Sequence, residues 1–293
     1  MVPEDASPEP ADAPAEDPAF VEQTQAAWTE RAERLSAERG WLTLVALSWL
    51  EPGSSNIGSA EDSPVKLPDW SAPAELGTLS RDGEVVTLQP APDVTLHIED
   101  KPVEGPVVLR HDGAEDGPVR VSYKTLQFWI IERQGKIGVR ARDSAHPARR
   151  DFDGIPHFEP TQQFRVSATL QTWDEPRIVS FPTAIGTTDE ARVPGEVSFE
   201  LNGQRMTLLP FQDDPEDDLF FVFADATSGI ETYGGGRFLY ADPPGEDGAV
   251  VLDFNRATNP PCAFTPFATC PLPPAGNRLS TRVEAGEKSP AGH

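Results

Sequence analysis

The sequence predicts a mainly β protein with one N-terminal amphipathic helix, a small β-sandwich and a larger antiparallel β-barrel or sandwich. After Gly40, short β-branched and aromatic runs alternate with Pro, Gly and Asp clusters at close intervals, which is typical of antiparallel β structure. We find no strand–helix–strand pattern and no repeat of fixed period. The 38% hydrophobic content of the 293 residues is enough for packed cores.

The chain begins with an acidic segment that is rich in Pro and Ala. Residues 1–18 lack the apolar groups that would offset the entropy of ordering, so we expect a disordered acidic tail. Residues 19–39 differ, because Phe20, Trp28, Ala32 and Leu35 recur at helical spacing and Gly40 supplies a C-terminal stop. This pattern predicts an amphipathic helix whose apolar stripe docks on a β region.

The rest of the chain divides into many short predicted strands. A break at 109–118 separates a small β-sandwich, 40–110, from a larger β region, 111–288, that carries the candidate site. Tight hairpin turns are expected at Gln134-Gly135 and Asn202-Gly203, where glycine can take a positive φ. The predicted strands are 42–48, 83–88, 94–98, 107–110, 124–133, 136–142, 164–170, 177–181, 195–201, 205–209, 220–224, 237–240, 250–254 and 280–284.

The segment 52–68 resembles the opening hairpin of a forkhead-associated (FHA) β-sandwich, a family that binds phosphothreonine. The arginine that this family has after Gly58 is Ser59 here, and no Ser-x-x-His follows. The resemblance therefore implies an FHA-like sandwich without the phosphate-binding residues.

The charge of the chain excludes several kinds of partner. The 48 acidic and 24 basic residues give a formal charge of −24, which repels nucleic acid and anionic membranes.

No apolar run approaches the ~18 residues of a membrane span, and the N-terminal region lacks the features of a secretory signal, so we expect a cytoplasmic protein. The scarcity of lysine suits either a halophile or an ordinary soluble protein from a high-GC genome. Stabilisation by molar KCl would favour the halophile.

Both cysteines and six prolines lie in the segment 253–277. Proline fixes φ and lacks a backbone donor, so this segment should be a stiff irregular loop that holds side chains in place. Its polar residues are Asp253, Asn255, Arg256, Asn259, Cys262, Thr269, Cys270 and Asn277. This composition is more typical of a site than of a linker.

A second polar loop contains three consecutive glycines at 234–236, which would let backbone N–H groups approach a ligand closely. Asp225, Thr227, Ser228 and Tyr233 precede the glycines, and Arg237 follows them. The alternative is a hairpin connection whose polar side chains bond their own backbone. The loop lacks the spacing and the lysine of a Walker motif.

Several segments of the sequence together resemble the DUF1684 family, whose function is not established. They are GWLTLVALSWLEPG at 40–53, IGVRARD at 137–143, FDG at 152–154, ADATSGIETYGGGRFL at 224–239, Asn277 and AGEK at 285–288. The resemblance implies a shared fold and a polar site built from these motifs. It implies no particular activity.

These residues predict a polar pocket that binds a small anionic metabolite. The expected ligand-binding residues are Arg140, Arg142, Thr227, Ser228, Tyr233, Arg237, Asn255, Arg256 and Asn259. Arginines of so acidic a chain can instead pair with Asp143, Asp225 and Asp253 in a structural ion network. A non-enzymatic interaction or structural β module is the alternative function.

Two arrangements would let the pocket hydrolyse its ligand. Asp225 and Asp253 would act as a carboxylate acid–base pair, or Cys262 would act as a nucleophile helped by His157 and Arg256. The alternative for Cys262 and Cys270 is two small buried thiols, since a cytoplasmic disulfide is disfavoured. Their spacing does not make a zinc site, although a mixed site with His157 and Asp225 stays open, and the sequence identifies no cofactor.

Overall fold

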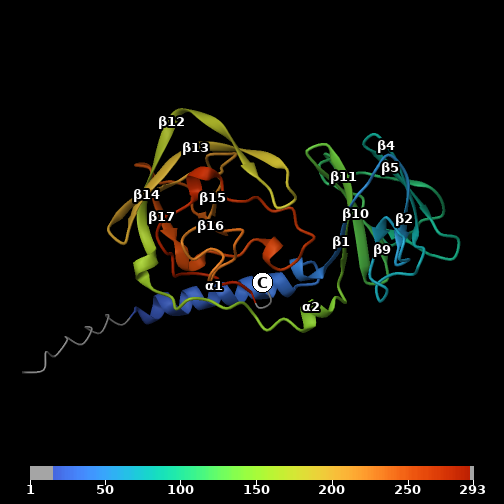
Figure 1. Cartoon of the computed structure of the whole chain (residues 1–293), viewed down its shortest axis with the longest axis horizontal. Coiled ribbons are helices and arrows are strands. Elements are labelled where there is room, and N and C mark those ends of the chain that lie inside the picture. Colours follow the sequence, from blue (N-terminus) through green and yellow to red (C-terminus); the bar gives the residue numbers. More distant parts are fainter. Residues whose placement is uncertain (1–15, 291–293) are drawn as a thin grey trace, which may run out of the picture.

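The computed structural model describes residues 16–290, which form one long helix and a series of mainly antiparallel sheets (Figure 1). The mainly β class is confirmed. The helix, α1, spans Pro18–Ser36. Asp17 caps it, because its Oδ1 accepts a 3.0 Å hydrogen bond from the Ala19 amide, and Pro18 occupies the first turn, where a missing N–H costs nothing. Residues 1–15 of the predicted tail lie outside the described residues.

Two sheets pack face to face in the N-terminal β region. Side chains from both sheets, such as Ile57, Leu79, Phe128 and Val139, share one buried core. One sheet has the order β1 (Leu44–Trp49), β11 (Lys136–Asp143), β10 (Leu126–Arg133), β9 (Val121–Tyr123), β6 (His97–Ile98) and β7 (Lys101–Pro102). The other has β3 (Val65–Lys66), β2 (Gly53–Gly58), β4 (Gly77–Asp82), β5 (Val85–Pro90) and β8 (Val107–Leu109).

The C-terminal β region has a separate core, which includes Phe199, Phe221, Leu239 and Phe254. Its larger sheet has the order β14 (Gln204–Leu208), β13 (Thr188–Leu201), β12 (Arg165–Pro182) and β17 (Ala249–Asp253), and β15 (Leu219–Phe223) pairs with β16 (Arg237–Ala241). The short helices of the chain are α2 (Pro147–Arg150) and the 3₁₀ turns η1 (Trp41–Thr43), η2 (Gln162–Phe164), η3 (Phe254–Arg256), η4 (Pro261–Ala263) and η5 (Ala275–Asn277).

Both predicted hairpin turns are confirmed. Gln134-Gly135 joins β10 to β11, and Asn202-Gly203 joins β13 to β14. All four residues have positive φ, between 49° and 76°, as a two-residue turn of this kind requires. Sheet pairing crosses the predicted break at 109–118, because β9, β10 and β11 belong to the same sheet as β1.

The strand predictions differ from the structure in three main respects. The strands predicted at 164–170 and 177–181 form one strand, β12, with an irregularity between Thr172 and Arg177. The strand predicted at 280–284 is wrong, because the backbone of Val283 bonds the side chains of Asp225 and Arg237 instead of a neighbouring strand. Strands β2 and β4 were missed, since Gly, Ser and Asn residues hide their apolar alternation.

Two segments position the candidate site. Helix α1 lies along the C-terminal β region and continues toward the N-terminal sheets (Figure 1). Apart from Asp253, the last residue of β17, the predicted loop 253–277 is confirmed as irregular, with three 3₁₀ turns. This loop contacts the N-terminal β region, because Arg140 Nη2 donates to Thr269 Oγ1 at 3.2 Å and Phe267 packs near Trp129. Among residues 16–290, no helix is long and apolar enough to cross a membrane.

Candidate functional site

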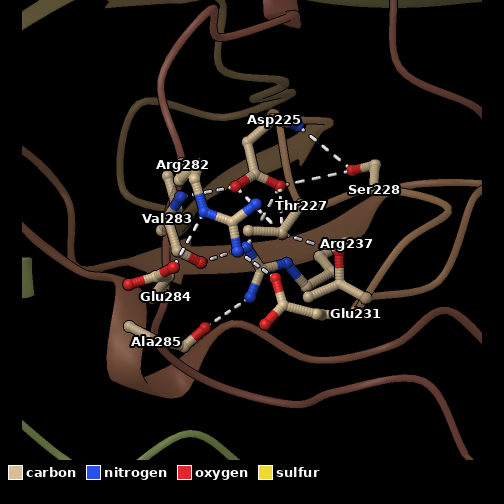
Figure 2. Close-up of polar contacts among 10 residues, drawn as sticks. Asp225, Thr227, Ser228, Glu231, Arg237, Arg282, Val283, Glu284 and Ala285 are labelled. Carbon is tan, nitrogen blue, oxygen red and sulfur yellow. Dashed lines mark hydrogen bonds and ion pairs between the residues drawn. The ribbon is translucent and has the colours of Figure 1, made fainter.

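The predicted site residues lie in three places, of which the first is a buried cluster around Asp225 (Figure 2). The Asp225 carboxylate accepts hydrogen bonds from Thr227 Oγ1 at 2.8 Å and from the Val283 amide at 2.6 Å. Arg237 Nη2 lies 3.4 Å from the same carboxylate, and neither side chain is exposed at all. Arg237 also donates to the carbonyl oxygens of Val283, at 2.9 Å, and of Ala285.

The contacts of Arg237 match the ion pair that the sequence left as the alternative to ligand binding. Burial lowers the pKa of Arg237, and the neighbouring Asp225 opposes that effect. We expected Thr227, Ser228 and Arg237 to face a ligand, but in the structure all three hydrogen-bond to Asp225. The cluster ties the loop after β15 to the chain segment near Val283.

The glycine at 236 has a packing role in this cluster. Its φ is +87°, and a Cβ at this position would lie 2.5 Å from Pro273 Cγ and 2.6 Å from the Phe223 carbonyl oxygen. Only glycine fits such a close approach of chain segments. The glycine therefore lets the loop pack against neighbouring segments, and its presence alone does not indicate a ligand.

The second place is the junction between α1 and the Pro-rich loop. Asn255 fixes this junction, since its side chain exchanges two hydrogen bonds with the Thr161 backbone, at 2.9 and 3.0 Å. The Trp28 indole of α1 donates to the Asn255 carbonyl at 2.9 Å. Arg256 is more open: its side chain is 55% exposed, and its Nε lies 3.8 Å from Asp253 Oδ2.

A buried carboxylate anchors α1 at the same junction. Glu287 accepts hydrogen bonds from Arg31 Nε at 3.3 Å and from the Asn259 amide at 2.6 Å. Arg31 also donates to the Asn259 carbonyl at 3.0 Å. Burial raises the pKa of Glu287, and Arg31 opposes this shift. The Asn259 side chain donates to the Lys288 carbonyl at 2.7 Å, so Asn259 holds the backbone here.

A cavity of about 590 Å³, which we call the α1 cavity, opens between α1 and strand β16. Arginine, aromatic and carboxylate side chains share its lining. The arginines are Arg31, Arg34 and Arg256, the aromatic residues are Trp28, Trp41, Phe238 and Tyr240, and the carboxylates are Glu30, Asp218 and Asp242. Of the predicted ligand-binding residues, Arg256 lines this cavity.

The third place is where the Pro-rich loop meets strand β11. Arg140 and Arg142 lie on one face of β11, as predicted, and burial lowers the pKa of each to about 10. Arg142 lies over the Trp129 ring, with its guanidinium carbon 4.8 Å from the ring centroid. The two arginines do not share the α1 cavity with Arg256, because neither is among its lining residues.

Both cysteines and Tyr233 are also found at this third place. The Cys262 amide donates to Cys270 Sγ at 3.2 Å, and the Tyr233 hydroxyl donates to the Cys262 carbonyl at 3.3 Å. A hydrogen bond with the Cys270 thiol lowers the pKa of Cys262 to about 7, although burial opposes it. The same thiol–thiol contact and burial raise the pKa of Cys270.

The residues expected to take part in hydrolysis contact different partners in the structure. His157 stacks on Trp28, with ring centroids 4.0 Å apart, and burial lowers its pKa to about 4. It makes no hydrogen bond with Cys262 among the described residues. Asp253 accepts from Asn255, whereas Asp225 belongs to the Arg237 cluster. In the range 16–290, no group of three or more His, Cys, Asp or Glu could hold a metal ion.

Comparison with known proteins identifies the family. The model of DUF1684, described as a protein of unknown function, matches residues 150–288. The chain belongs to the DUF1684 family. An uncharacterized protein of Haloarcula marismortui with a solution NMR structure is 37% identical over 50% of this chain and 81% of that chain, with a TM-score of 0.42. No curated protein matches the chain significantly.

The DUF1684 motifs contain one junction residue that our sequence reasoning missed. Glu287 lies within the AGEK segment at 285–288, so its place in a motif that resembles the family could have drawn attention to it. Trp28 and Arg31 are three positions apart on α1, which places them on one helix face, but we assigned that face to docking alone. Trp41 and Tyr240 carried no sequence signal of a cavity.

Proposed function

We propose that this protein binds a small anionic molecule with an aromatic or apolar portion in the α1 cavity. The observation that carries the proposal is the meeting of three guanidinium groups and four aromatic side chains in one cavity of a chain whose formal charge is −24. Its volume of about 590 Å³ lies within the range of small-molecule sites.

Arg256 is the main candidate for contact with the anion. Its 3.8 Å separation from Asp253 is longer than a good hydrogen bond, and its side chain is 55% exposed. Its planar guanidinium can therefore form a bidentate contact with a carboxylate, sulfonate or phosphate group. Arg31 differs, because Glu287 and Asn259 already fix its guanidinium.

The aromatic side chains support an apolar portion in the ligand. Trp41 is 36% exposed and Tyr240 is 56% exposed, although both are large side chains that would be stabilised by burial. A ring of the ligand could cover these surfaces while its anionic group contacts Arg256.

The acidic side chains of the cavity limit the charge of the ligand. Glu30, Asp218 and Asp242 balance the three arginines in number, and Arg34 already pairs with Glu30. These carboxylates would repel a polyanion but could accept hydrogen bonds from an amine or hydroxyl group. A monoanion or a zwitterion therefore suits the cavity better than a polyphosphate.

Binding does not require the hydrolytic chemistry that the sequence suggested. Asp225 already pairs with Arg237, and Asp253 already bonds Asn255. Hydrolysis by these two carboxylates stays a prediction. The second class, a protein-interaction or structural module, predicts no selective small-molecule binding at Arg256.

The test is a fluorescence titration with 8-anilinonaphthalene-1-sulfonate, which combines an aromatic body with a single anionic group. Arg256→Ala should weaken its binding about tenfold, because the sulfonate loses its bidentate partner. The control is Arg150→Ala, which removes the same charge from a side chain that is 77% exposed and pairs with Asp151. Both variants should keep the wild-type melting temperature.

Equal affinity of the Arg256→Ala and Arg150→Ala variants for the probe would overturn the proposal. Independently of the titration, native mass spectrometry of the protein purified from its own cell type would identify a retained natural ligand. A retained small anion whose occupancy falls in Arg256→Ala would support the α1 cavity.

A further inference from the structure

The chain contains two cysteines, and the fold brings them into contact. The Cys262 amide donates to Cys270 Sγ at 3.2 Å, and both thiols are free. Cysteines that only fill space in a core need not contact each other. The contact between Cys262 and Cys270 therefore suggests a chemical role.

The backbone around each cysteine is held by separate contacts. Cys262 lies in the 3₁₀ turn η4 (Pro261–Ala263). The Cys270 carbonyl accepts a 2.8 Å hydrogen bond from the Ala184 amide, and Pro271 bridges to Thr183 in the turn between β12 and β13. Prolines at 260, 261 and 271 restrict the loop further. A stiff scaffold therefore holds the Cys270 sulfur against the turn that carries Cys262.

The two thiols differ in their access to solvent. Cys262 is partly exposed, whereas Cys270 is only 5% exposed. The Tyr233 hydroxyl donates to the Cys262 carbonyl at 3.3 Å, and the positive charge of Arg140 acts on Cys270. An accessible thiol in front of an enclosed one is the arrangement of an attacking and a resolving cysteine.

We propose that Cys262 and Cys270 form a dithiol site that reacts reversibly with low-molecular-weight disulfides to give an internal Cys262–Cys270 disulfide. The proposal is independent of ligand binding in the α1 cavity. Disulfides in reducing compartments are usually transient, which agrees with a reversible reaction.

The reaction has two balanced steps. The Cys262 thiolate attacks one sulfur of the small disulfide, forms a mixed disulfide and releases one thiolate. Cys270 then loses its proton to solvent and attacks the Cys262 sulfur, which releases the second thiolate. Two protein thiols are oxidised, the small disulfide is reduced to two thiols, and the two protons from the cysteines end on the released thiols.

The acidities of the two thiols agree with these roles. The hydrogen bonds from Cys270 and Tyr233 lower the pKa of Cys262 to about 7, so a large fraction is thiolate at neutral pH. The thiol–thiol contact and burial raise the pKa of Cys270, which keeps it protonated until the mixed disulfide forms.

The experiment treats the folded, reduced protein with glutathione disulfide and maps the products by mass spectrometry. No Lys or Arg lies between Arg256 and Arg278, so one tryptic peptide, 257–278, carries both cysteines. In the wild type this peptide should lose two hydrogens and carry no glutathione. In Cys270→Ser it should carry one glutathione on Cys262, because the resolving thiol is absent.

Cys262→Ser should react at least about tenfold more slowly than the wild type, since the remaining thiol is enclosed. A wild-type product that holds glutathione without an internal disulfide would overturn the proposal. Two thiols that stay inert in the native protein but react after unfolding in urea would overturn it as well.

The wild-type protein also gives a test that needs no variant. Iodoacetamide should label Cys262 before Cys270, with a rate that rises through a midpoint near the lowered pKa of Cys262, about 7. Equal labelling of the two cysteines, or a midpoint at the ordinary thiol value of ~8.5, would contradict the assigned roles.

Discussion

The Arg237 cluster and the α1 cavity contain the same chemical groups in opposite environments. In the cluster, the guanidinium and the carboxylate of Asp225 are both fully buried, and backbone carbonyls take up further donors. In the cavity, Arg256 is 55% exposed and lies 3.8 Å from its carboxylate partner. In the first arrangement, removal of either partner would leave an uncompensated buried charge. The second leaves donors available to a ligand.

This difference shows why a polar motif does not by itself mark a binding site. The Gly-rich loop has Asp, Thr, Ser and Arg at short spacing, yet these groups hydrogen-bond to one another rather than face a ligand. The cavity depends on contacts between α1 and residues more than 200 positions away, such as Trp28 with Asn255. Solvent access, which separates the two places, arises only from tertiary packing.

The largest expected effect is on the buried cluster. Asp225→Ala leaves Arg237 as a buried charge without its partner and removes the acceptor of the Val283 amide. We expect the free energy of unfolding to fall by about 3–5 kcal/mol, measured by chemical denaturation. The control, Asp151→Ala, removes a carboxylate that is 61% exposed and should cost less than about 1 kcal/mol. Similar losses in both variants would show that the cluster is not structural.

A smaller effect is expected where α1 meets the cavity. Arg31→Met leaves Glu287, which is 1% exposed, without its cation. We expect the free energy of unfolding to fall by about 2 kcal/mol near pH 8. This is less than for Asp225→Ala, because Glu287 can take up a proton.

The pH dependence tests this explanation of the Arg31→Met effect. Burial already raises the pKa of Glu287 in the wild type, and removal of Arg31 should raise it further. The stability loss should therefore shrink near pH 5, where protonated Glu287 no longer needs a cation. A loss that is equal at both pH values would contradict the role of the ion pair.

Local patterns in the sequence predicted much of the fold. The helix, the two hairpin turns and the irregular Pro-rich loop follow from residue spacing, from glycine at positive φ and from proline. Arg140 and Arg142 were correctly placed on one face, because alternation in a strand is a local property. The predicted strand at 280–284 failed because side chains of distant residues take its backbone hydrogen bonds.

The candidate site was less predictable than the fold. Arg256 could be named because it lies in the Pro-rich loop, but Trp41 and Tyr240 look like ordinary core residues in the sequence. They line the α1 cavity, which opens between α1 and β16 and so depends on tertiary packing. Likewise, the contact of Cys262 with Cys270 depends on the turn at Ala184, which the spacing of the cysteines does not reveal.

A third prediction concerns the His157–Trp28 stack beside the cavity. Burial lowers the pKa of His157 to about 4, so the folded state favours the neutral ring. The neutral His157 ring therefore contributes its full stability above ~6.5, the pKa of histidine in the unfolded chain. This contribution is lost as the pH falls toward 4, because the unfolded chain then binds a proton that the folded state does not. We expect the free energy of unfolding to fall by only about 1–2 kcal/mol over this pH range, because solvent screens a ring that is partly exposed.

The matched variant for this prediction is His157→Phe, which keeps a ring against Trp28 but cannot be protonated. Its unfolding free energy should fall less than that of the wild type between pH 7 and pH 4. Parallel pH profiles of the two proteins would show that His157 is not responsible for the acid sensitivity.

The smallest expected effect has the opposite sign and belongs to the cavity. Asp253 lies 3.8 Å from Arg256 and also accepts hydrogen bonds from the Asn255 amide and side chain. Asp253→Asn keeps an acceptor oxygen for Asn255 but removes the charge that competes for Arg256. Binding of 8-anilinonaphthalene-1-sulfonate should therefore become about two- to threefold tighter, as expected for a partly screened charge. Asp151→Asn, which removes an equal charge elsewhere, should leave the affinity unchanged. If both variants bind equally well, the effect is one of net charge, and Arg256 is not the group that contacts the anion.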